Sequence, residues 1–221
     1  MNVIRAVIVF CALAPALVQA QTEAPPRASL SAGMGVAYAS YADVTTLINA
    51  TVSPAQVVSR YRTAVEFFGA GTLPLASPWL LKFEYAYSLA TFSPQGAFGP
   101  STFDVTYQMP SLILQYMLVD RGVYSFRAGA GGGYHFGRLE ENTLYLNDTF
   151  SAKGPGFVVE IEANTAFGDH LYAYLGANAR WELVGTVTDA RGASPGVAQS
   201  GLPVTLHSFG AGARLGASYL F

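Results

Sequence analysis

Beyond its first 20 residues, the chain alternates apolar with small or polar side chains, in many short runs. In 171–184, for example, apolar residues such as Leu175 and Trp181 occupy every second position, with Asn178 and Arg180 between them. Successive side chains of a β-strand point to opposite faces, so each set occupies one face. The same alternation recurs in 79–90, 156–168 and 204–221. The sequence therefore predicts a sheet protein whose strands each have one apolar and one mixed face.

A soluble β-sandwich alternates in the same way, but two features favour a membrane barrel. The mixed faces are rich in Gly, Ala and Ser, which suits the crowded inside of a narrow barrel better than a hydrated surface. Charged residues make up only 12% of the chain, against about 25% in a typical soluble protein. The best candidate for a membrane helix after residue 20, 105–119, is too short and contains Pro110.

Aromatic residues cluster near the ends of the runs, as expected for rings at a membrane–water interface. The residues expected to mark one end are Trp79, Tyr116, Tyr124, Phe167, Tyr219 and Phe221. The residues expected to mark the other end are Tyr38, Tyr87, Tyr134, Phe136, Phe157 and Trp181.

The lengths of the connections predict the topology. Tight turns with Asp and Gly are expected at 119–122 and 167–170, and long polar connections at roughly 138–155 and 185–203. Short turns that alternate with long loops are typical of transmembrane barrels, with the tight turns on the periplasmic side. The predicted fold class is all-β: a closed antiparallel up-and-down transmembrane β-barrel, with a ten-strand count as the alternative to eight. The eight expected strands are 28–41, 56–68, 79–90, 102–118, 123–137, 156–168, 171–184 and 204–221.

Two of these strands have an ambiguous pattern. Residues 53–68 also fit a helix, with Ser53 as N-cap and Pro54 at the first helical position, although an even strand count favours a strand. In 102–118 the polar face changes parity at Pro110. This change predicts a β-bulge at the proline, because bulges are places where sheets tolerate proline.

The expected register places charged residues in the barrel interior and none on the outward face of a predicted strand. A basic residue that faces lipid costs about 2–4 kcal/mol at mid-bilayer, whereas inside a barrel it needs an ionic partner. We therefore expect an ion-paired interior, with Glu160 and Glu162 close to Asn178 and Arg180 on the next strand. The predicted interior network is Arg60, Arg62, Glu66, Lys82, Glu84, Asp104, Arg127, Glu160, Glu162, Arg180, Glu182 and Arg214.

The first 20 residues have the layout of a cleaved signal peptide. Arg5 precedes an apolar run at 6–17, and a small-x-small cleavage site ends at Ala20. Residues 21–27 are expected to be a flexible leader and 28–221 the barrel. Cys11, the single cysteine, leaves with the signal peptide, so disulfides and cysteine-based sites are not expected.

The C-terminal residues RLGASYLF, with Arg214, Gly216, Tyr219 and Phe221, resemble the signal by which the barrel-assembly machinery recognises outer-membrane barrels. The chain from residue 28 onwards resembles the small outer-membrane β-barrel family of the opacity-protein and OmpA-transmembrane-domain type. TYQMPSLILQYML followed by YSFRAGAGGGYHFG looks like that family's proline-led strand and its glycine-rich, aromatic successor. The resemblance implies a bacterial outer-membrane location, contact with outer-membrane lipid and lipopolysaccharide, and a structural, adhesive or protective role.

Residues that carry chemistry are few in the sequence. No cluster has metal-ligand spacing, and we expect no metal, cofactor or catalytic site, hence no enzyme. His135 is expected to point inward near Glu160 as a polar plug residue, and His207 and Ser208 to face opposite sides of a strand. A net charge of −2 gives no basic surface for nucleic acid.

The expected function is therefore that of an integral outer-membrane barrel with a plugged interior. Its structural or surface-interaction role would be carried by loops near 42–55, 91–101, 138–155 and 185–203, with a surface ligand that the sequence does not name. A small-solute channel or carrier is the alternative, and a lipid-modifying outer-membrane enzyme is a further one.

Overall fold

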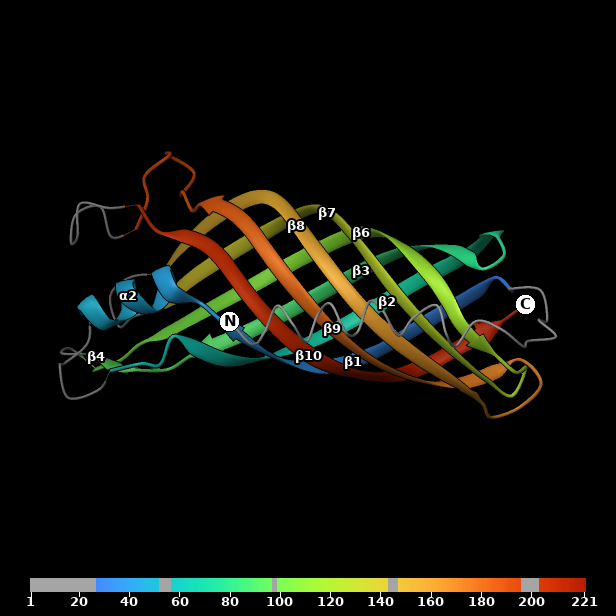
Figure 1. The fold of residues 1–221 in the computed structure, drawn as a ribbon. Coiled ribbons are helices and arrows are strands. Elements are labelled where there is room, and N and C mark those ends of the chain that lie inside the picture. Colours follow the sequence, from blue (N-terminus) through green and yellow to red (C-terminus); the bar gives the residue numbers. More distant parts are fainter. Residues whose placement is uncertain (1–26, 52–56, 97–98, 143–146, 196–202) are drawn as a thin grey trace, which may run out of the picture.

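Eight long antiparallel strands close into a barrel in the computed structural model of the chain, which describes residues 27–51, 57–96, 99–142, 147–195 and 203–221 (Figure 1). Each strand pairs with its sequence neighbours, and the first pairs with the last, so the ladder is a ring without an edge. The predicted fold class is confirmed, with eight strands rather than ten. The barrel strands are β1 (Ser29–Ser40), β2 (Tyr61–Ala76), β3 (Trp79–Phe92), β6 (Thr102–Asp120), β7 (Tyr124–Asn142), β8 (Asn147–Ala166), β9 (Leu171–Thr186) and β10 (Thr205–Leu220). The predicted signal peptide, 1–20, and all but the last residue of the predicted leader lie outside the described residues.

The two ends of the barrel differ in their connections. Tight turns at 77–78, 121–123 and 167–170 lie at one end, which also holds the C-terminus (Figure 1). The opposite end carries helix α2 (Ala42–Thr51) and a small hairpin of β4 (Gln95–Gly96) and β5 (Gly99–Pro100). We call these the turn end and the loop end. The predicted tight turns after β6 and β8 are present.

Side chains alternate between the inside and the outside along every barrel strand. In β8, Glu160 and Glu162 are buried inside, while Val159 and Ile161 are about half exposed on the outside. Leucine, valine and aromatic side chains cover the outer surface in this way on all eight strands. A closed ladder satisfies every strand hydrogen bond internally, and this apolar exterior suits hydrocarbon.

Aromatic rings pair on the outer surface near both ends, as the sequence predicted. The contacts near the loop end are Tyr38–Tyr61 at 5.4 Å between ring centroids, Tyr134–Phe136 at 5.8 Å and Trp181–Phe209 at 5.0 Å. The contacts near the turn end are Trp79–Tyr116 at 5.0 Å and Tyr219–Phe221 at 5.2 Å. These rings mark the two levels at which the barrel leaves the hydrocarbon.

Several predicted boundaries at the loop end are wrong. The expected loop at 138–155 is mostly strand, because the β7–β8 ladder continues to the pair Asn142 and Asn147. The expected loop at 42–55 contains α2. The second strand begins at Tyr61, and residues 53–56 of the strand-or-helix segment lie outside the described residues. Strands can extend past the membrane because their backbone is paired whether lipid or water surrounds it.

The predicted β-bulge at Pro110 is also wrong. Tyr85 pairs with Pro110 and Glu84 with Ser111 in one uninterrupted register, and Pro110 points outward. The register shift of this strand lies instead between Met117 and Val119, near the turn end. The residues before the proline keep their polar side chains outward because they lie at the loop end, where the outer face need not be apolar.

Helix α2 has ten residues and sits at the mouth of the barrel (Figure 1). Among the residues that the structure describes, no helix is long and apolar enough to cross a membrane.

The outer face gives a first prediction. Leu215 is 64% exposed and lies on β10 midway between the rings of Phe209 and Phe221. Leu215→Arg should lower the free energy of unfolding by about 2–4 kcal/mol, because the guanidinium would face mid-bilayer lipid. The measurement is urea unfolding of the protein refolded into lipid vesicles. The matched control is Val57→Arg, at an exposed residue before β2. An equal loss of stability in both variants would contradict the conclusion that lipid surrounds the barrel between the two levels of aromatic residues.

Candidate functional site

Charged side chains fill the turn-end half of the barrel interior. Nine of the twelve residues predicted for the interior network are buried inside the barrel, each 6% exposed or less, and Glu182 lies at the edge of this set that is nearest the loop end. They come from six of the eight barrel strands, β2, β3 and β7 to β10, and converge on the axis. The nine are Glu66, Lys82, Glu84, Arg127, Glu160, Glu162, Arg180, Glu182 and Arg214.

Glu84 is the centre of this network. Its carboxylate lies 3.0 Å from Nζ of Lys82 and 2.8 Å from a guanidinium nitrogen of Arg214, and it also pairs with Arg180. Arg214 and Arg180 both reach Glu66 as well. Glu84 and Lys82 are fully buried, so each of these charges depends on its ionic partners rather than on water.

A second arm of the network runs from Lys82 to β8. The Lys82 ammonium lies 2.9 Å from Glu160 and 3.2 Å from Glu162, and Arg127 donates to Glu162 at 3.2 Å. Gln115 adds a hydrogen bond of 2.8 Å to Glu160. The network therefore links β3, β6, β7 and β8 through ionic and hydrogen-bonded contacts.

The expected pairing of Glu160 and Glu162 with the next strand is wrong. Glu160 lies opposite Asn178 in the ladder, but its carboxylate reaches across the lumen to Lys82 on β3. Arg180 likewise reaches across to Glu84 and Glu66. In a narrow barrel, inward side chains meet near the axis, so partners come from strands that are not neighbours in the sheet.

Glu182 pairs with His135 rather than with the other eight buried charges, and three further residues of the predicted network lie at the surface. Arg60 precedes β2 and is exposed, with its guanidinium over the ring of Tyr61. Arg62 is exposed at the mouth, where it donates to the carbonyl of Thr91 at 2.9 Å. Asp104 lies on the outer face of β6 and accepts a hydrogen bond of 2.6 Å from the hydroxyl of Thr91. All three are at the loop end, where water rather than an ion pair can solvate the charge.

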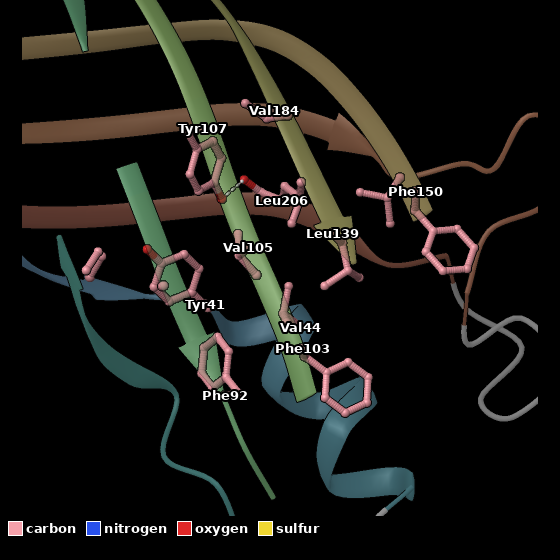
Figure 2. Close-up of a cluster of buried hydrophobic side chains, with 14 of the residues drawn as sticks. Tyr41, Val44, Phe92, Phe103, Val105, Tyr107, Leu139, Phe150, Val184 and Leu206 are labelled. Carbon is pink, nitrogen blue, oxygen red and sulfur yellow. Dashed lines mark hydrogen bonds between the residues drawn. The ribbon is translucent and has the colours of Figure 1, made fainter. Parts of the chain in front are cut away.

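The loop-end half of the interior is apolar and closed by α2 (Figure 2). Val44, Leu47 and Ile48 of the helix are at most 6% exposed and face the strands. This apolar plug also contains Tyr41, Phe92, Phe103, Val105, Tyr107, Leu139, Phe150, Val184, Val187, Val204 and Leu206. Sequence reasoning missed the plug, although the spacing of the three helical residues, i, i+3 and i+4, is the signal of an amphipathic helix.

Polar contacts fix the plug in the mouth. Asp43 at the start of α2 accepts a hydrogen bond from Thr205 of β10. The side-chain oxygen of Asn49 accepts a hydrogen bond of 2.7 Å from the backbone N–H of Val58, and its Nδ2 donates to the carbonyl of Val58 at 3.1 Å. These bonds hold the C-terminal part of α2 to the segment that leads into β2. The hydroxyl of Tyr107 donates to the carbonyl of Leu206 at 3.0 Å across the lumen (Figure 2). The helix is thus attached at both ends.

A hydrogen-bonded chain of Ser111, His135 and Glu182 lies between the two layers. The Ser111 hydroxyl is 3.1 Å from Nε2 of His135, and Nδ1 of His135 bonds the Glu182 carboxylate. His135 points inward as expected, but its acidic partner is Glu182 rather than Glu160. A nucleophile, a base and an orienting acid in this order are the parts of a serine hydrolase.

The surroundings of this triad leave no room for a substrate. Ser111 is 2% exposed and His135 is fully buried. The neighbouring cavity holds about 30 Å³, about one or two water molecules, and is lined by Glu182 and Arg180 but not by Ser111. Gly156 is needed beside the imidazole, because a Cβ there would overlap the His135 ring and lie 2.6 Å from Glu182. The triad is packed as part of the interior.

The residues of the predicted C-terminal signal lie on both the inner and the outer face of the barrel wall. Tyr219 and Phe221 are exposed on the outside, and Arg214 is buried in the ion network. Gly216 packs against β1, where a Cβ would meet the backbone of Gly33 at 2.9 Å. The amide of Phe221 donates to the carbonyl of Ala28 at 3.0 Å, so the strand is paired to its end.

Among the described residues, no group of histidine, cysteine and acidic side chains could hold a metal ion. His207 faces outward and is exposed, while His170 lies in a turn and bonds the carbonyl of Leu220 at 2.9 Å.

Solved structures of other proteins support the barrel fold, whereas sequence comparisons find no match. No protein-family model matches the sequence, and no curated protein is similar in sequence. The crystal structure of Neisserial surface protein A matches with a TM-score of 0.54 at 12% identity, over 90% of this chain and 100% of that one. A major outer membrane protein of Thermus thermophilus gives 0.52 at 14% identity, over 89% and 100%. Ail of Yersinia pestis gives 0.50 at 10% identity, over 89% and 100%.

The chain has the fold of the small outer-membrane β-barrel proteins. Proteins of this fold lie in the bacterial outer membrane, and the apolar band between the two rings of aromatic residues meets the requirement of that location.

The ion network gives a second prediction. Glu84→Gln should lower the free energy of unfolding by about 3–5 kcal/mol, because Lys82, Arg180 and Arg214 would lose a shared buried partner. Urea unfolding in vesicles measures the change. Glu140→Gln, which removes a part-exposed ion pair with Arg138, serves as control and should cost no more than about 1 kcal/mol. Equal stabilities of the two variants would show that the network does not hold the barrel.

Proposed function

We propose that the protein is a closed outer-membrane barrel that does not conduct and acts through its outer surface. The observation that carries this proposal is the continuous filling of the lumen, by an ion network at the turn end and an apolar plug at the loop end. The cavity between them holds about 30 Å³. A solute would have to displace both layers and the nine buried charges of the interior.

The surface role falls to the loop end. The connections from β1 to β2, from β3 to β6 and from β9 to β10 start and end there, next to the projecting β7–β8 hairpin. The resemblance of the sequence to opacity-type barrels supports a structural or surface-interaction role. So does the likeness of fold to a Neisserial surface protein and to a protein named for an attachment invasion locus. In this proposal residues 1–20 direct export, and Arg214, Gly216, Tyr219 and Phe221 present the strand to the barrel-assembly machinery.

A third prediction tests closure. The purified protein in planar lipid bilayers should show no steady open events, because the ion network blocks the lumen even where the plug is weakened. Val44→Ser, Leu47→Ser and Ile48→Ser combined should therefore stay silent as well. As a control for folding, the unboiled protein should migrate differently from the boiled protein in SDS gels. Steady conductance of the folded wild type would refute the closed barrel and favour a channel.

The triad of Ser111, His135 and Glu182 makes a hydrolase the second candidate function. Its hydrogen-bond order suits nucleophilic catalysis, but the serine oxygen lies in a packed interior without space for an acyl group. We infer that the triad is a structural link between the ion network and the plug.

A fluorophosphonate probe decides between these two roles. The folded wild type should remain unlabelled, because the Ser111 oxygen is buried and the probe cannot reach it. The matched control is Ser111→Ala. Labelling of the wild type that disappears in this variant would establish an accessible nucleophile and overturn the structural role.

A further inference from the structure

Outward-facing charges gather on one side of the barrel. On β1, β2, β3, β9 and β10, as far as the structure describes them, no charged side chain points outward. At the loop end of β6, β7 and β8 there are four, which are Asp104, Arg138, Glu140 and Lys153. Among the described residues, the other barrel strands carry no outward charge at this level, and the exposed Arg60 precedes β2 with its guanidinium over the ring of Tyr61. This one-sided distribution is not explained by the folding of the barrel.

The two basic residues are neighbours on the outer surface. Lys153 lies directly opposite Phe136 in the β7–β8 ladder, and Arg138 opposite Ser151. Arg138 and Lys153 are therefore diagonal neighbours on one face, about 7–8 Å apart at the backbone. Like charges at this spacing repel each other, and an anion bound between them removes the repulsion.

A recess in the wall surrounds this basic pair. It holds about 550 Å³ and is lined by Arg138, Lys153, Phe136 and hydroxyl or amide side chains. The polar lining residues are Thr106, Gln108, Ser151, Thr186 and Thr188. The recess thus offers two cations, several hydrogen-bond donors and one aromatic ring, which is the chemistry that holds a phosphate next to an apolar group.

The basic pair lies at the level of the lipid headgroups. Phe136 and Tyr134 belong to the band of aromatic residues that surrounds the barrel near the loop end. Arg138 is two residues further along β7, which on a tilted strand is about 5 Å beyond the hydrocarbon edge. The headgroup layer is about 5–8 Å thick on each side. Lys153 starts beside Phe136, and its long side chain can extend into that layer.

Acidic residues on the same face stand further from the membrane. Glu140 forms an ion pair of 2.8 Å with Arg138, and Asp104 lies opposite Glu140 in the ladder. Glu140 partly neutralises Arg138 but does not fix it, because the arginine side chain is 55% exposed. Lys153 has no ion-pair partner within the described part of the chain. The charge pattern is therefore basic at the headgroup level and acidic above it.

We propose that this recess binds the phosphate group of a glycolipid of the outer leaflet, with Lys153 and Arg138 holding the phosphate and Phe136 contacting the adjoining lipid. A lipid is favoured over a soluble anion because the recess opens sideways from the wall at headgroup height, not toward the tips of the loops. The proposal does not depend on closure of the lumen: steady conductance would overturn the proposed function and leave this site untouched.

The test is native mass spectrometry of the folded protein in detergent, titrated with diphosphoryl lipid A. The wild type should retain the lipid. Arg138→Gln with Lys153→Gln should bind roughly 30-fold more weakly, the loss expected for two basic residues at an anionic lipid surface. The control, Arg62→Gln with Arg191→Gln, removes two exposed basic residues of the loop end that lie outside the recess and should bind like the wild type.

Three results would overturn the proposal. Equal binding by the two double variants would show that the basic pair is not the site. Equal binding of dephosphorylated lipid A by the wild type would show that phosphate is not recognised. Full displacement of the lipid by inorganic phosphate or by a soluble sulfated polysaccharide would assign the recess to a soluble anion. A shift in mobility on boiling in SDS confirms that each variant is folded before the titration.

Discussion

The pairing of β1 with β10 is the constraint on which the rest of the structure depends. Twelve residues of β1, from Ser29 to Ser40, pair with β10 and turn an open sheet into a ring. Without it, two strands would expose unpaired backbone groups to lipid, where each costs several kcal/mol. Closure also fixes the radius, since eight strands leave an interior only wide enough for side chains. The interior must then be filled by whatever the alternating pattern directs inward.

The small radius requires an interior filled by side chains. The two halves of the interior are filled in different ways. Below the apolar plug the pattern directs nine charges inward, and they are stable because groups such as Glu84 have several partners of opposite charge. At the loop end the inward residues are apolar, and the strands alone do not close the mouth. Helix α2 supplies Val44, Leu47 and Ile48 to this layer, so a surface connection becomes part of the core.

The sequence predicted the features that depend on alternation alone. The eight strands, the inward direction of Lys82 and Glu84 and the outward direction of the aromatic residues follow from a period of two and from the cost of charge in lipid. The partners of the charges did not follow, because Glu160 meets Lys82 across the lumen. Such a contact depends on the barrel radius and the stagger of the strands, which a local pattern does not contain.

The failure at Asp104 has a more specific cause, and it bears on function. Asp104 was expected to point inward through a bulge at Pro110, but a polar residue of a strand has to point inward only where hydrocarbon surrounds the barrel. At and beyond the loop-end band of aromatic residues either face can be polar, so Asp104, Arg138 and Lys153 can point outward at little cost. Since folding does not require charges there, their restriction to β6, β7 and β8 is a property of the surface. A barrel with a filled lumen makes its contacts through its outer surface, and this part of that surface lies next to the loop-end aromatic residues Tyr134 and Phe136.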